Sequence, residues 1–150
     1  PAGRDWLSMV PYVLAHERHH SAWGYHHYVL NHQLQPCLLA SLVSEGSADV
    51  FAHHLCPGQS PAWTGALTPR EEALQRQAIL PLLSVLDFDG AIHRRIFFGD
   101  PAGGVPPFTG YTIGFHILQG YLSSHPRETV TSWTLRPPRE ILAGSGYPDL

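Results

Sequence analysis

The first thirty residues place apolar side chains three to four residues apart, the spacing of an amphipathic helix. The positions that carry the pattern are Trp6, Met9, Val10, Val13, Leu14 and Trp23. Asp5 is a suitable N-cap for a helix over residues 5–31. Pro11 predicts either a start near Val10 or a kink, because proline lacks the N–H that a helix interior requires.

The hydrophobic pattern, together with residues that begin or end helices, predicts further helices. A second helix covers residues 35–58, opened by Pro36 and stopped by Pro57-Gly58, and a loop rich in Pro, Gly and Ser follows over 57–68. A third covers 68–86, with Thr68 as N-cap, Pro69 at the first helical position and a possible kink at Pro81.

The remainder of the chain continues the helical pattern. We expect a short helix over 90–100, an irregular loop over 101–110, a helix over 111–126, a short helix or extended piece over 127–135, and one or two turns within 137–150. No strand is convincing. The pattern predicts one mainly α-helical domain over residues 1–150.

Composition narrows the function classes. The 150 residues are 43% hydrophobic and 14% charged, with a formal net charge of −3, which gives no reason to expect a nucleic acid as partner. No apolar run is long enough for a membrane span. The first ten residues lack a basic start followed by an apolar stretch. The compartment stays unknown, with the cytoplasm favoured.

Residues 16–20 read His-Glu-Arg-His-His and contain the pattern H-E-x-x-H. Histidines at i and i+4 project from one face of a helix, so His16 and His20 can bind one zinc ion. Glu17 is placed to take a proton from a zinc-bound water and pass it to the leaving amine. With eleven histidines in the chain, a coincidental match on a metal-free helix remains the alternative.

The second helix supplies a candidate third ligand. Glu45 and Asp49 are four residues apart and therefore share a face of an otherwise apolar helix, where buried carboxylates are costly without a cation. We expect Glu45 to complete a His₂Glu shell and Asp49 to orient a ligand histidine. His26 is a rival third ligand, but its zinc class needs a glycine where Trp23 stands.

Peptide hydrolysis also requires a group that stabilises the oxyanion of the tetrahedral intermediate. The stretch "GYTIGFHILQGYL" offers Tyr111 and His116, on a helix whose glycines allow close helix approach, and Tyr25 is a further candidate. Among the other histidines, we expect His19 to point away from the site, whereas His27, two turns beyond the ligands, could line a cleft.

Three motifs, "AHERHH", "SEGSADVFA" and "GYTIGFHILQGYL", occur in this order and resemble a bacterial family of predicted zinc-dependent proteases, the YjaZ-like group. The resemblance implies a helical, gluzincin-like metallopeptidase domain, with His16, His20 and Glu45 as zinc ligands, Glu17 as general base and Asp49 as supporting residue. Zincins generally place a small sheet before the H-E-x-x-H helix. Only 15 residues precede His16, so we expect this chain to be the C-terminal part of a longer protein.

The sequence therefore favours a zinc metallopeptidase that hydrolyses a peptide or protein substrate. One alternative is a metal-stabilised binding or chaperone-like module, in which His27 or His116 supplies a fourth ligand. Another is a helical interaction domain without metal. The oligomeric state stays open.

Overall fold

The computed structural model describes residues 6–32, 34–87 and 90–147 of the chain. Helices fill most of these ranges, and the only β pairing within them is two isolated bridges, Cys37 with Leu86 and Asp100 with Val105. The prediction of a mainly α-helical chain is confirmed. Within the described ranges, every helix is too short or too polar to cross a bilayer.

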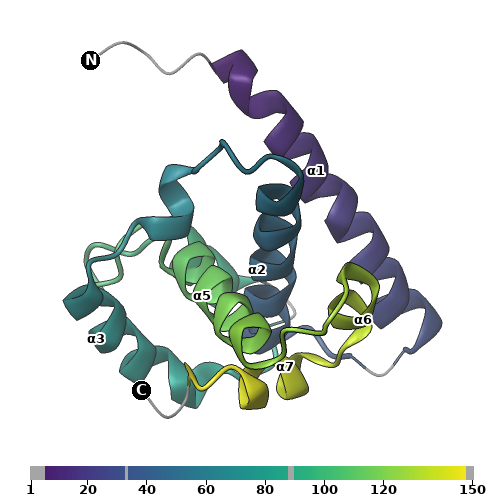
Figure 1. Cartoon of the computed structure of the whole chain (residues 1–150). Coiled ribbons are helices and arrows are strands. Elements are labelled where there is room, and N and C mark those ends of the chain that lie inside the picture. Colours follow the sequence, from purple (N-terminus) through teal and green to yellow (C-terminus); the bar gives the residue numbers. More distant parts are fainter. Residues whose placement is uncertain (1–5, 33, 88–89, 148–150) are drawn as a thin grey trace.

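The helices follow the predicted order (Figure 1). The α-helices are α1 Trp6–Gly24, α2 Leu38–Leu55, α3 Pro69–Ile79, α4 Ala91–Phe98, α5 Thr109–Ser124, α6 Val130–Leu135 and α7 Pro138–Gly144. A π-helical turn, Tyr25–Leu30, extends α1, and short 3₁₀ turns span Ala62–Gly65 and Leu80–Leu82. The segment over 127–135, left open between helix and extended chain, contains the short helix α6.

The predicted helix boundaries agree closely with the structure at several caps. Thr68 caps α3 in a capping box with Glu71, and Pro69 is its first residue. Around Pro81 the chain changes to the 3₁₀ turn Leu80–Leu82. Pro36, by contrast, lies just before the N-cap Cys37 rather than in the first turn of α2. The proposed N-cap Asp5 lies outside the described residues.

Helices α2 and α5 form the centre of the molecule, and α1 lies along the other side of α2 (Figure 1). Glycines bring α2 and α5 into close contact: a Cβ on Gly114 would collide with the carbonyl oxygen of Leu42, and a Cβ on Gly46 with that of Gly114. The core contains Leu42, Ile113 and Leu118, which are all fully buried. The predicted close approach through glycines of α5 is therefore confirmed.

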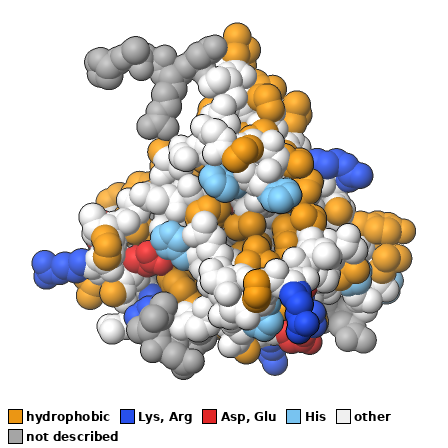
Figure 2. All heavy atoms as spheres, viewed as in Figure 1, with side chains coloured by type: hydrophobic (Ala, Val, Ile, Leu, Met, Phe, Trp, Pro, Cys, Tyr) orange, Lys and Arg blue, Asp and Glu red, His pale blue; other side chains and the backbone are white. Residues whose placement is uncertain are grey.

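The face of α1 that the structure buries differs from the apolar face that the sequence predicts. Trp6 and Leu14 are 72% and 64% exposed, and the start of α1 extends beyond the other helices (Figures 1 and 2). The buried positions are Tyr12, His16, His19 and Trp23. Of the predicted apolar positions, only Trp23 is fully buried, because α2 and α6 supply polar partners to the histidine face. Pro11 lies inside α1, which begins five residues before it.

Candidate metal centre

Three side chains from α1 and α2 converge at the centre of the histidine face. His16 Nε2 lies 3.0 Å from His20 Nε2 and 3.2 Å from Glu45 Oε2, and His20 Nε2 lies 3.3 Å from the same carboxylate oxygen. Within the described part of the chain, this is the one group of three or more His, Cys, Asp or Glu side chains whose ligand atoms lie close enough to share a metal ion.

The separations of these atoms fit a small tetrahedral cation. Two ligands that are each 2.0–2.1 Å from a tetrahedral zinc ion lie about 3.3 Å apart, from the geometry of the tetrahedron. The three separations in the structure, 3.0 to 3.3 Å, are close to this value. The donor set of two imidazole nitrogens and one carboxylate oxygen is also typical of a catalytic zinc site.

Asp49 fixes the orientation of the His16 ring. The carboxylate is fully buried, and its Oδ1 lies 2.9 Å from His16 Nδ1. Because a carboxylate accepts, His16 donates from Nδ1, and in the neutral ring the lone pair is therefore on Nε2, the atom that faces the cluster. The Tyr12 hydroxyl donates to Asp49 Oδ1 at 3.1 Å, and Trp63 Nε1 donates to Oδ1 at 3.0 Å. Three donors therefore hold this carboxylate in place.

His20 has a polar partner of its own on α2. Its Nδ1 lies 3.0 Å from the Ser44 hydroxyl oxygen, so its Nε2 also faces the cluster. Ser44 was not identified from the sequence, nor were Tyr12 and Trp63. The only signal for Ser44 was its position next to Glu45, whereas Trp63 comes from the 3₁₀ turn in the predicted loop and could not be placed from periodicity.

The cluster has the electrostatics of a cation site. Burial lowers the pKa of His16, but its hydrogen bonds to Asp49 and Glu45 outweigh this and raise it to about 9. Burial raises the pKa of Glu45, but the hydrogen bonds with His16 and His20 outweigh burial and lower this pKa to about 2. Without a metal, the raised pKa of His16 favours its protonated form, whose positive charge faces the carboxylates of Glu45 and Asp49.

Glu17 and Tyr111 lie close to the cluster. Glu17 is exposed on α1, next to His16. Burial raises the pKa of Tyr111 to about 12, and the negative charges of Glu45, Asp49 and Glu17 add to the effect. The Tyr111 ring contacts the rings of Phe97 and Trp63. The three carboxylates therefore lie close enough to the Tyr111 hydroxyl on α5 to raise its pKa.

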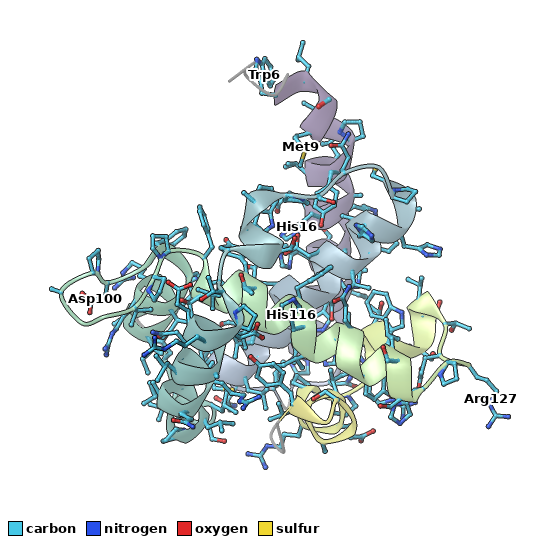
Figure 3. The ribbon with its side chains drawn as sticks, turned by 60° about the vertical axis from the view of Figure 1, so that its left-hand side comes forward. Trp6, Met9, His16, Asp100, His116 and Arg127 are labelled. Atoms are coloured by element: carbon cyan, nitrogen blue, oxygen red, sulfur yellow. The ribbon has the colours of Figure 1, made fainter. Side chains whose placement is uncertain are left out.

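His116 has a different environment from Tyr111, although both are on α5. Its Nδ1 donates to Glu72 Oε1 at 2.8 Å, and the Tyr147 hydroxyl donates to the same oxygen at 2.9 Å. This group links α3, α5 and the segment after α7. Figure 3 shows His116 on α5 and His16 on α1. The catalytic role of His116 stays a prediction.

The remaining histidines are accounted for by other contacts. His19 is only 3% exposed and stacks on Trp133, with Nε2 donating to the Thr134 hydroxyl. As expected, it points away from the cluster, although it is buried against α6. Its burial lowers its pKa to about 3, so it is neutral. His26 Nε2 accepts a hydrogen bond from Asn31, outside the cluster.

Comparisons with known proteins agree with this geometry. A family model described as "Predicted Zn-dependent protease" matches residues 3–143. The chain is 26% identical to Bacillus subtilis YjfC over 149 residues, covering 93% of this chain and 48% of that protein. It is 27% identical to YjaZ from the same organism over 122 residues, covering 80% of this chain and 45% of that protein. The chain thus spans about half the length of these relatives, and no solved structure matches it.

Proposed function

The chain belongs to the family of predicted Zn-dependent proteases, and from this premise we propose that it is a gluzincin-type zinc metallopeptidase. In this proposal His16, His20 and Glu45 hold one zinc ion. The observation that carries it is the convergence of three acceptor atoms at 3.0 to 3.3 Å, with each imidazole engaged through its outer nitrogen. Three such atoms at these distances require a cation or a shared proton between them, and a bound metal ion satisfies all three at once.

When bound, zinc supplies Lewis-acid chemistry, polarising a carbonyl and making a coordinated water more acidic. The Glu17 carboxylate acts as general base and then general acid: it takes the proton of the attacking water and delivers it to the departing amine. Its exposed position on α1, one residue after His16, allows it to reach a bound peptide without being a ligand itself.

Tyr111 is the residue to which we assign oxyanion stabilisation. Its raised pKa keeps the hydroxyl protonated at neutral pH, so it can donate a hydrogen bond to the developing charge. His116 is the less favoured candidate because Glu72 already accepts from its Nδ1.

The number of ligands separates this function from a metal-stabilised binding module. A closed structural site has four protein ligands, whereas a catalytic site has three and leaves one position open. Among the described residues, the group contains only three side chains. His27, a suggested fourth ligand, instead donates from Nε2 to the carbonyl oxygen of Thr134 at 3.0 Å.

The substitution Glu17→Gln tests the proposal, because it preserves size and removes the base. We expect the variant to retain zinc but to hydrolyse a mixed peptide substrate at least about 100-fold more slowly. Glu140→Gln, at an exposed acid on α7, is the matched control and should keep full activity. Hydrolysis that survives Glu17→Gln would contradict the mechanism, and a zinc-loaded chain that cleaves no peptide would contradict the peptidase assignment.

A further inference from the structure

A cavity of about 700 Å³ lies apart from the candidate metal centre, at the far end of the π-helical turn. The segments that surround it are this turn, the connection into α2, the chain after the 3₁₀ turn Leu80–Leu82, and the start of α7. Its volume is in the range of sites that bind small organic molecules. His27, which the sequence suggested could line a cleft, is one of the residues around this cavity.

The cavity combines apolar walls with one positive charge. Leu34, Leu39, Leu86 and Pro137 supply apolar surface, and Arg139 supplies a guanidinium group. The described residues around the cavity include no acidic side chain. Arg139 makes no ion pair within the described part of the chain. An exposed guanidinium beside an apolar surface is suited to a carboxylate that carries an apolar body.

His27 adds a hydrogen-bond acceptor of defined orientation. It is 5% exposed, and its Nε2 must carry the proton because the partner is the carbonyl oxygen of Thr134. Nδ1 therefore presents a lone pair, and no hydrogen bond from another described residue reaches it. Burial lowers the pKa of His27, which keeps the ring neutral.

We propose that this cavity binds the C-terminal end of an apolar peptide. Arg139 pairs with the terminal carboxylate, His27 Nδ1 accepts the N–H of the last peptide unit, and the leucine side chains enclose the apolar residues. A free fatty acid shares the carboxylate and the apolar body but lacks the N–H donor. The inference does not depend on the metal centre, because none of the three candidate ligands lines the cavity.

Calorimetric titration with acetyl-leucyl-leucine and with its C-terminal amide tests the proposal. We expect the acid to bind about tenfold more tightly than the amide, because only the acid forms the charge-assisted pair. Octanoate should bind at least about tenfold more weakly than the dipeptide acid, because it offers no hydrogen to His27. Arg139→Gln should remove the difference between acid and amide. Arg127→Gln, at an exposed residue outside the cavity (Figure 3), should preserve it.

Several results would overturn the proposal. They are equal affinity of the wild-type chain for acid and amide, a preference for the acid that survives Arg139→Gln, and no binding at millimolar ligand. Octanoate binding as tightly as the dipeptide acid would overturn the assignment to a peptide end. His27→Phe should weaken acid and amide alike by about fivefold. A folded His27→Phe chain, verified by circular dichroism, that binds both ligands normally would also contradict the proposal.

Discussion

Removal of the buried Asp49 carboxylate should both destabilise the fold and weaken zinc binding. In Asp49→Ala, His16 Nδ1 and Trp63 Nε1 lose their acceptor, whereas Tyr12 still reaches the backbone carbonyl oxygen of residue 49 at 3.0 Å. Each unpaired buried donor costs about 1–3 kcal/mol, so the loss of both acceptors should lower the free energy of unfolding by about 2–6 kcal/mol. Losing the orienting carboxylate should also weaken zinc binding by about 10- to 100-fold.

Asp49→Asn separates the two effects. The amide oxygen at the position of Oδ1 can still accept from His16, Tyr12 and Trp63, so we expect a smaller loss of stability. The negative charge that makes His16 a stronger base is gone, however, and zinc affinity should still fall by about tenfold.

The assays are competition against a chromogenic zinc chelator and urea unfolding in the presence of EDTA. Asp100→Asn is the matched control, because Asp100 lies in the loop between α4 and α5, away from the cluster (Figure 3). The expected order of zinc affinity is wild type, then Asp49→Asn, then Asp49→Ala. If Asp49→Ala binds zinc as tightly as the wild type, or if Asp100→Asn weakens binding equally, the assigned role of Asp49 is wrong.

Ser44, Gly114 and Glu72 each make a contact whose loss can be measured. Ser44→Ala removes the partner of His20 Nδ1 and should weaken zinc binding about tenfold with little change in urea midpoint; unchanged affinity would show that the hydroxyl does not orient the ring. Gly114→Ala places a methyl group against a carbonyl oxygen of α2 and should cost about 3 kcal/mol in urea unfolding; a wild-type midpoint would contradict the close helix contact. Glu72 has a pKa lowered by His116 despite its burial. The ionised Glu72 carboxylate therefore stabilises the folded chain fully above its unfolded pKa of about 4.3. This stabilisation is lost as the pH falls through the lower pKa that Glu72 has in the folded chain. Glu72→Gln should cost about 1 kcal/mol at pH 7 and progressively less as the pH falls below about 4, and a cost that does not change with pH would refute this.

The sequence was sufficient to identify the candidate ligands because helix geometry is local. The spacing of His16 and His20, and that of Glu45 and Asp49, places each pair on one helix face whatever the rest of the chain does. The cost of burying two carboxylates on an apolar helix then predicts that they face cationic partners. The structure brings all four side chains together.

The face on which α1 packs could not be predicted from its apolar residues. Periodicity favours burial of Val13 and Leu14, yet both are exposed while His19 is buried. The histidine face is buried because Asp49, Ser44 and the Thr134 hydroxyl supply hydrogen bonds from α2 and α6. Those partners are between 24 and 115 residues away in the sequence, so a local pattern does not identify them.

For α5, too, the sequence predicts local properties but not the partners that distant segments supply. Its glycines correctly predicted a close helix contact, because a missing Cβ is a local property. The partner of His116 depends on how α3 packs, and Glu72 was visible in the sequence only as an acid in the first turn of that helix. Tyr111 and His116 were therefore equivalent candidates until the tertiary contacts distinguished them.

Zinc analysis of the purified chain shows whether His16, His20 and Glu45 hold a metal ion. After exhaustive dialysis, elemental analysis should find one zinc ion per wild-type chain. Glu45→Ala should bind zinc at least about 100-fold more weakly, while the exposed control Glu140→Ala should keep the wild-type stoichiometry. Absence of zinc from the wild-type chain under zinc-replete conditions, or tight stoichiometric binding that is indifferent to Glu45, would contradict the site described here.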